Sequence, residues 1–164
     1  MKLHRVVGAA LALMFMTGAA LANPDGAPWG ASNPQSVQNC HSCHFDGKAN
    51  LNSSAITLEG VPKAIKAGET YRLTLNLAKP EKTVAGFLAS VSRGKFSAQA
   101  GDLEVMKGQI RSTEPKLEIA KWVFDWTAPE EIDGEVVFMI AANAANDDQS
   151  SFGDEIHFRT FTVK

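Results

Sequence analysis

The chain has 164 residues, and its 16 Lys and Arg against 18 Asp and Glu leave a formal net charge of −2. Nucleic acids and anionic membranes attract basic surfaces, so this balance argues against either as the main partner. The length suits one domain, and a chain with 45% hydrophobic residues can bury a core without disulfide staples. The two cysteines of the chain therefore need another explanation.

Residues 1–22 have the pattern of an export signal. A positively charged start is followed by an apolar stretch over residues 6–20 and by the small-residue cleavage site Ala20-Leu21-Ala22. The pattern predicts cleavage before Asn23. A retained membrane anchor is the alternative, but Thr17 and Gly18 interrupt a run that is already short for a membrane span. We expect a protein of the periplasm or the cell exterior, with no transmembrane anchor after cleavage.

Both cysteines fall in the pentapeptide Cys40-His41-Ser42-Cys43-His44, which has the spacing of a c-type haem attachment site. Two thiols three residues apart on a helical turn can form thioethers with the two vinyl groups of one haem, and His44 then presents its imidazole to the iron. Asn33 and Pro34 have the pattern of an N-cap and a first helical residue, which predicts a helix over about 34–44. The predicted cofactor is one covalent haem c, carried by a haem-attachment segment over residues 23–50.

Three other uses of Cys40 and Cys43 remain open at this point. A redox-active dithiol is one, although such pairs usually lie in a βαβ context that this sequence lacks. A transition metal bound with His41 and His44 is the second. The third is a plain Cys40–Cys43 disulfide, as expected in an oxidising compartment. The export signal and the histidine directly after the second cysteine favour haem.

An electron-carrying haem usually has a second axial ligand, Met or His. We prefer His157 for this role over Met106, because the sequence before Met106 has the pattern of strands and not of a helical cytochrome. The alternative for His157 is an exposed strand histidine that shares a face with Arg159. Met139 lies in an apolar run typical of a core strand, and His41 is too close to the tether to reach the far side of the haem. Water or a second molecule could also supply the ligand.

Beyond residue 50 the hydrophobic pattern changes to the alternation of β-strands. Strands are predicted over about 71–77, 85–91, 121–126 and 155–163, and a nearly continuous apolar run predicts another over 135–142. Turn signals separate them, and Gly86 suggests a bulge or a close approach of two chains. The pattern predicts a mainly β protein, with an immunoglobulin-like antiparallel β-sandwich over residues 51–164 after a short helical haem-attachment segment. It excludes a helical cytochrome fold for most of the chain.

Other candidate sites are weaker. The acidic loop 146–148 and Asp154 offer oxygen ligands for calcium, but the spacing favours a solvated hairpin loop. Trp122 and Trp126 lie on one strand face, which indicates core residues more than a sugar-binding platform. Neither a Ser/His/Asp constellation nor a phosphate-binding loop is visible, so hydrolysis and phosphoryl transfer have no support.

The second half of the chain resembles the Reeler-like, or choice-of-anchor V, β-sandwich domains. The resemblance lies in the runs 122–129, 134–138 and 142–146 and in Gly153-Asp154. Further matches in the same order are Gly26-Ala27-Pro28, the Cys-x-x-Cys-His motif, the strand at Tyr71 and the pair Gly86-Phe87.

The resemblance implies a secreted protein with a haem-attachment motif ahead of an immunoglobulin-like sandwich. It implies that Cys40 and Cys43 tether the haem and that His44 is the proximal ligand. Two features depart from the family. A Thr-His-Thr-like segment that precedes the Trp-rich strand in many members corresponds here to residues 111–115, which contain no histidine, and the frequent C-terminal surface anchor is not seen.

The sequence thus predicts an exported monohaem c-type cytochrome-like protein that passes single electrons between redox partner proteins and is not an enzyme. The alternative is an extracellular binding or adhesion module in which the haem, or a disulfide of the same cysteines, is structural. A haem enzyme or gas sensor with an open sixth position is a third hypothesis.

Overall fold

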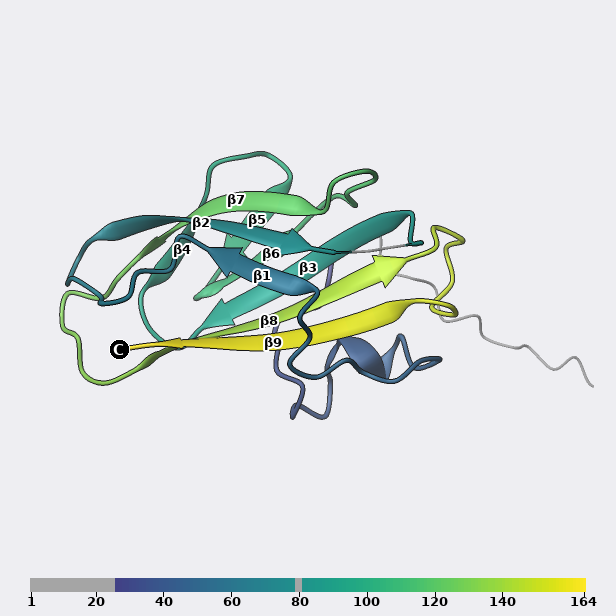
Figure 1. Ribbon diagram of the computed structural model, residues 1–164, viewed down its shortest axis with the longest axis horizontal. Helices are drawn as coiled ribbons and strands as arrows, with labels where there is room; N and C mark the ends of the chain where they lie inside the picture. The colour runs from purple at the N-terminus through teal and green to yellow at the C-terminus, as the bar shows by residue number, and fades with distance from the viewer. Residues whose placement is uncertain (1–25, 79–80) are drawn as a thin grey trace, which may run out of the picture.

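The computed structural model describes residues 26–78 and 81–164, so the predicted signal peptide lies outside the described residues. The described chain forms two antiparallel β-sheets that pack face to face (Figure 1). The first sheet has the order β1 (Ile56–Glu59), β2 (Thr70–Leu77), β7 (Lys121–Thr127) and β4 (Lys95–Ala98). The second has the order β5 (Leu103–Met106), β6 (Gln109–Ser112), β3 (Val84–Val91), β8 (Val136–Ala145) and β9 (Glu155–Val163).

This architecture confirms the predicted mainly β fold and the β-sandwich. All five strands expected from the hydrophobic pattern are present as β2, β3, β7, β8 and β9. The expected helix over 34–44 is wrong, because that stretch contains only a single 3-10 turn, η1 (Cys40–Ser42). Gly86 makes the expected close approach, since a Cβ atom there would lie 3.1 Å from the Oγ atom of Ser112 on β6.

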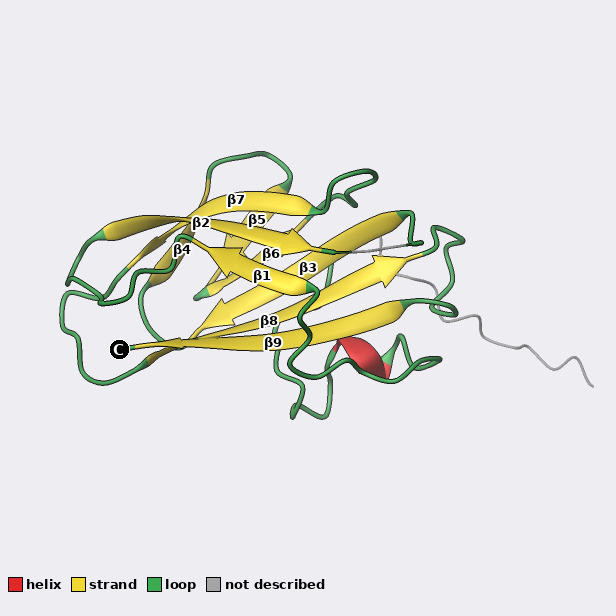
Figure 2. Cartoon of the chain, in the orientation of Figure 1, coloured by secondary structure: helices red, strands yellow, loops and turns green. Residues whose placement is uncertain are grey.

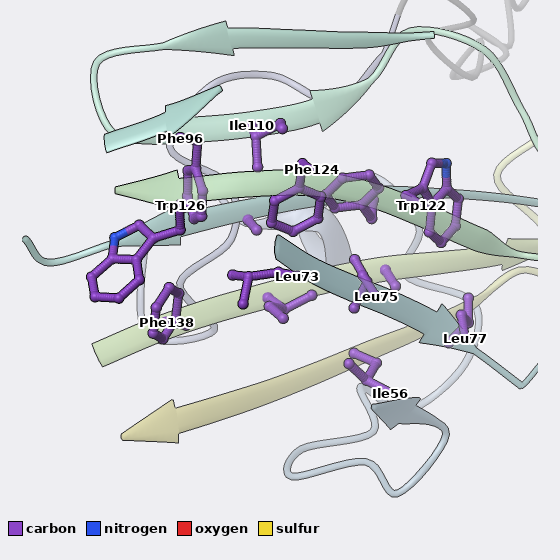
Figure 3. Packing of buried hydrophobic residues seen from close by; sticks show 14 of the residues in the cluster. Ile56, Leu73, Leu75, Leu77, Phe96, Ile110, Trp122, Phe124, Trp126 and Phe138 are labelled. Atoms are coloured by element: carbon purple, nitrogen blue, oxygen red, sulfur yellow. The ribbon is translucent and has the colours of Figure 1, made fainter. Parts of the chain in front are cut away.

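The core lies between the two sheets and is rich in aromatic rings (Figure 3). Trp126 of β7 meets Phe138 of β8 edge to face at 5.1 Å between ring centroids, and Phe87 of β3 packs on Trp122 at 4.8 Å. Both tryptophans are fully buried, which confirms that they are core residues. Such aromatic pairs across the sandwich bury large apolar areas and fix how the sheets pack.

The segment ahead of β1 lies on the outer face of the five-stranded sheet (Figure 2, with the short helical turn in red below β9). The hydroxyl of Ser32 donates to that of Ser90 on β3 at 2.8 Å. Further along, Asn50 and Ser53 bind the edge of β9: the Asn50 N–H donates to the carbonyl of Ile156 at 2.8 Å, and the Ser53 N–H to that of Phe158 at 2.9 Å. The segment is therefore hydrogen-bonded to the five-stranded sheet both before and after the cysteine motif.

Within residues 26–78 and 81–164, no helix is long and apolar enough to cross a membrane.

Candidate functional site

The cysteine motif begins on a capped turn. The Asn39 side chain accepts a backbone N–H of the turn at 2.9 Å, while the Asn39 N–H donates to the Ser42 hydroxyl at 3.1 Å. The N–H groups of Cys43 and His44 both donate to the carbonyl of Cys40, at 3.4 and 3.2 Å. In a 3-10 turn, residues three apart lie above one another. Cys40 and Cys43 are three residues apart in this turn, and the His44 N–H donates to the same carbonyl as the Cys43 N–H.

The two thiols differ in their surroundings. Cys40 packs on a small apolar cluster on the outer face of β8 and β9, made of Ala141, Ile156 and Phe158. Its thiol donates to the carbonyl of Ala31 at 3.5 Å, and burial raises the pKa of the Cys40 thiol to about 12. Cys43 is exposed, and both cysteines are free thiols in this structure. The Cys40 side chain therefore faces the sheet, and the Cys43 side chain faces solvent.

His44 is held from behind by a buried carboxylate. Its Nδ1 atom lies 2.6 Å from Oδ2 of Asp154, whose side chain is 1% exposed. Asn143, on the outer face of β8, donates from Nδ2 to the same Oδ2 atom at 3.1 Å. A carboxylate oxygen accepts hydrogen bonds, so the geometry places an Nδ1–H of His44 toward Asp154. Nε2 is then the ring atom that a metal could use as its ligand.

An exposed aromatic pair lies beside this histidine. Phe45 follows His44 directly and meets Phe152 edge to face at 5.6 Å, although each of the two side chains is 54% exposed. The N–H of Gly153 donates to a carboxylate oxygen of Asp46 at 3.1 Å. These contacts join the loop after the cysteine motif to the loop before β9, and they leave an apolar surface next to His44.

The structure does not bring the two distal candidates to His44. His157 lies on the inner face of β9, opposite the cysteine motif, and its Nδ1 atom is 2.8 Å from the Ser53 hydroxyl. Met106 ends the far edge strand β5, three strand spacings or about 14 Å from β8.

The histidine on β9 also corrects an expectation. His157 shares its face with Arg159 as predicted, but only 7% of it is exposed, because the segment over residues 50–56 covers this edge of the sandwich. The interpretation of His157 as an exposed strand histidine is therefore wrong. Burial lowers the pKa of His157, and the nearby Glu155 carboxylate opposes this shift.

The other candidate ligands named from the sequence are Met139, His41 and the acidic residues of the loop before β9. Met139 was expected in the core, but it is half-buried on the outer face of β8, four residues from Asn143. The ring of His41 turns back to the carbonyl of His44, at 3.0 Å from its Nδ1 atom. Among the described residues, no three or more His, Cys, Asp or Glu side chains converge on a common point. Asp154 faces His44, and Asp148 accepts from Asn146 and from the Ser150 N–H. Residues 146–148 lie exposed in the loop between β8 and β9, in agreement with the preferred interpretation as a hairpin loop.

Sequence reasoning missed the roles of Asp154 and Asn143 at this site. They are 110 and 99 residues from His44 along the chain, and only the sandwich brings the three side chains together. One signal was present in the sequence, because Asn143 interrupts the otherwise apolar run of β8. A polar side chain in such a run needs a partner when the strand is covered on both faces.

No protein family and no curated protein matches the chain by sequence. Solved structures do match. The Reelin-N domain of F-spondin is 19% identical with a TM-score of 0.54, over 75% of this chain and 94% of that domain. The human F-spondin reeler domain, fragment 1, is 19% identical with a TM-score of 0.50, over 72% and 94%. At this identity the similarity concerns the fold alone, and it agrees with the predicted Reeler-like sandwich. The chain thus folds as a β-sandwich similar to the reeler domain.

Proposed function

We propose that this chain is an exported monohaem c-type cytochrome-like protein that carries single electrons between redox partner proteins. One observation supports this function above the others. Cys40, Cys43 and His44 lie in and directly after one capped turn, and the buried Asp154 binds Nδ1 of His44, so that Nε2 is the ring atom that would bind iron. A haem c attached there would supply a one-electron iron couple.

The residues of the site fit this cofactor. Cys40 and Cys43 would hold the porphyrin through thioethers, and His44 would bind the iron. Phe45, directly after that histidine, and Phe152 provide an exposed apolar surface on which a porphyrin face could pack. A Zn-type site of four side chains fits less well, since the ring of His41 is bound to a backbone carbonyl of the same turn.

The exposed position of the site suits electron exchange with a redox partner protein. Cys43, Phe45 and Phe152 are all exposed, so the cofactor would lie at the surface and not inside the sandwich. An exposed apolar patch on a soluble domain commonly marks a contact surface. Export is part of the proposal and rests on the signal pattern of residues 1–22.

The deciding experiment is to make the full chain in cells that export proteins and carry the c-type maturation system. We expect covalent haem on a denaturing gel, an intact mass equal to the chain from Asn23 plus one haem, and a reversible one-electron titration. The Cys40→Ala, Cys43→Ala double variant should carry no haem. His44→Ala should keep the haem mass but change the visible spectrum.

A colourless wild-type protein without the haem mass would reject the cytochrome. A Cys40–Cys43 disulfide in that protein would support the binding-module alternative instead. Carbon monoxide added to the reduced protein tests the haem enzyme or gas sensor, because an open sixth position would produce a spectral shift.

A further inference from the structure

The carboxylate that contacts His44 belongs to Asp154, which is almost fully buried and meets two side chains, His44 and Asn143, through one oxygen. We propose that Asp154 sets the reduction potential of the haem iron by acting through His44, and that Asn143 moderates this effect. The inference rests on the proposed function. Asp154 is in this view a positioning and tuning residue, and it touches neither haem nor iron.

The first step is the strength of the contact. At 2.6 Å between Nδ1 of His44 and Oδ2 of Asp154, the hydrogen bond is in the short range of charge-assisted pairs. The Asp154 side chain is almost fully buried, so water does little to screen its charge. A carboxylate that accepts the Nδ1 proton makes the imidazole a more basic ligand at Nε2. A more basic ligand stabilises ferric over ferrous iron and lowers the potential.

The second step is that only one oxygen of the carboxylate has hydrogen-bond donors. Its other oxygen, Oδ1, is buried and makes no hydrogen bond within the described part of the chain. A carboxylate that served only to hold two loops together would be expected to bind donors through both oxygens, because an unpaired buried acceptor costs stability. Here the donors are His44 and Asn143 alone, and both meet Oδ2.

The third step concerns Asn143. Its Nδ2 atom donates to the oxygen that also receives the His44 proton, so the two donors compete for the same negative charge. Removal of the amide should strengthen the bond between Asp154 and His44. The two residues therefore have opposite predicted effects, and a general loss of structure would not reproduce that difference in sign.

The test is a spectroelectrochemical titration of the haem-loaded full chain and three variants. Asp154→Asn keeps the shape but removes the carboxylate, and it should raise the ferrous-to-ferric ratio at a fixed potential; a tenfold rise corresponds to about 59 mV for one electron. Asn143→Leu should lower the potential by a smaller amount. Asp147→Asn is the matched control, because Asp147 is exposed in the same loop and its positive φ of 64° suits Asn.

A potential for Asp154→Asn equal to that of the Asp147→Asn control would overturn the inference and leave the cytochrome itself intact. If Asp154→Asn does not mature with haem, the potential of Asn143→Leu decides, and a value equal to wild type overturns the inference. A wild-type chain without covalent haem would reject the proposed function and this inference together.

Discussion

Phe158 links the cysteine motif to the sandwich, and its replacement tests that link. The ring lies on the outer face of β9, 2% exposed, and belongs to the cluster on which Cys40 packs. Phe158→Ala removes most of this apolar contact without touching the motif. We therefore expect the variant to lose stability and the turn Cys40–Ser42 to be held less firmly on the sheet.

The magnitude follows from the burial of the ring. Replacing a fully buried Phe by Ala typically costs about 3–5 kcal/mol, and a thin outer cluster that can partly collapse belongs at the lower end, near 3 kcal/mol. At roughly 3–4 °C per kcal/mol for a domain of this size, the melting temperature should fall by about 10 °C. Phe152→Ala makes the same chemical change at a ring that is 54% exposed, and should cost under about 1 kcal/mol.

Urea unfolding followed by circular dichroism measures both variants against wild type. The free energies of unfolding should differ by about 2 kcal/mol between the two Phe→Ala variants. Equal losses, or a loss below about 1 kcal/mol for Phe158→Ala, would refute the packing of the motif on this face of the sheet.

Three further predictions concern the sandwich. Burial lowers the pKa of His157 in the folded chain, so near pH 6.5 the unfolded chain binds a proton at this histidine more readily than the folded chain does. The free energy of unfolding should therefore fall as the pH drops below that value. His157→Asn should lose less stability between pH 7 and pH 5 in urea titrations, and an equal loss would contradict this. Gly94→Ala should destabilise by more than about 2 kcal/mol, since its φ is +80° and a Cβ would lie 2.4 Å from a backbone oxygen, whereas Gly134→Ala, also at positive φ but in open space, should cost about 1 kcal/mol. Arg72→Ala should change the melting temperature by under about 3 °C, because its ion pair with Asp125 at 3.0 Å is largely solvent-exposed on the arginine side; a larger fall would show a stronger pair.

The long strands could be predicted because each spans seven residues or more, enough to show alternation or, in β8, a nearly continuous apolar run. The short strands β1, β4, β5 and β6 have four residues each, which is too few for alternation to stand out from a loop. The helix over 34–44 was expected from Asn33 and Pro34. In the structure Asn39 caps the turn instead, and the Asn39 and Ser42 side chains each accept a backbone N–H of this turn. The helical stretch ends within one turn.

The sequence by itself determined the chemistry that the chain can offer: two cysteines and a histidine at haem-attachment spacing, and strands with one apolar face. Local spacing and period carry that information, because adjacent residues in a turn or strand have nearly fixed relative positions. Only the tertiary structure decided which groups surround the motif. It placed Asp154 and Asn143 behind His44 and turned His157 to the other face of its sheet. The register of β8 and β9 and the course of the segment over their outer face determine those contacts, and both depend on packing between residues far apart in the chain.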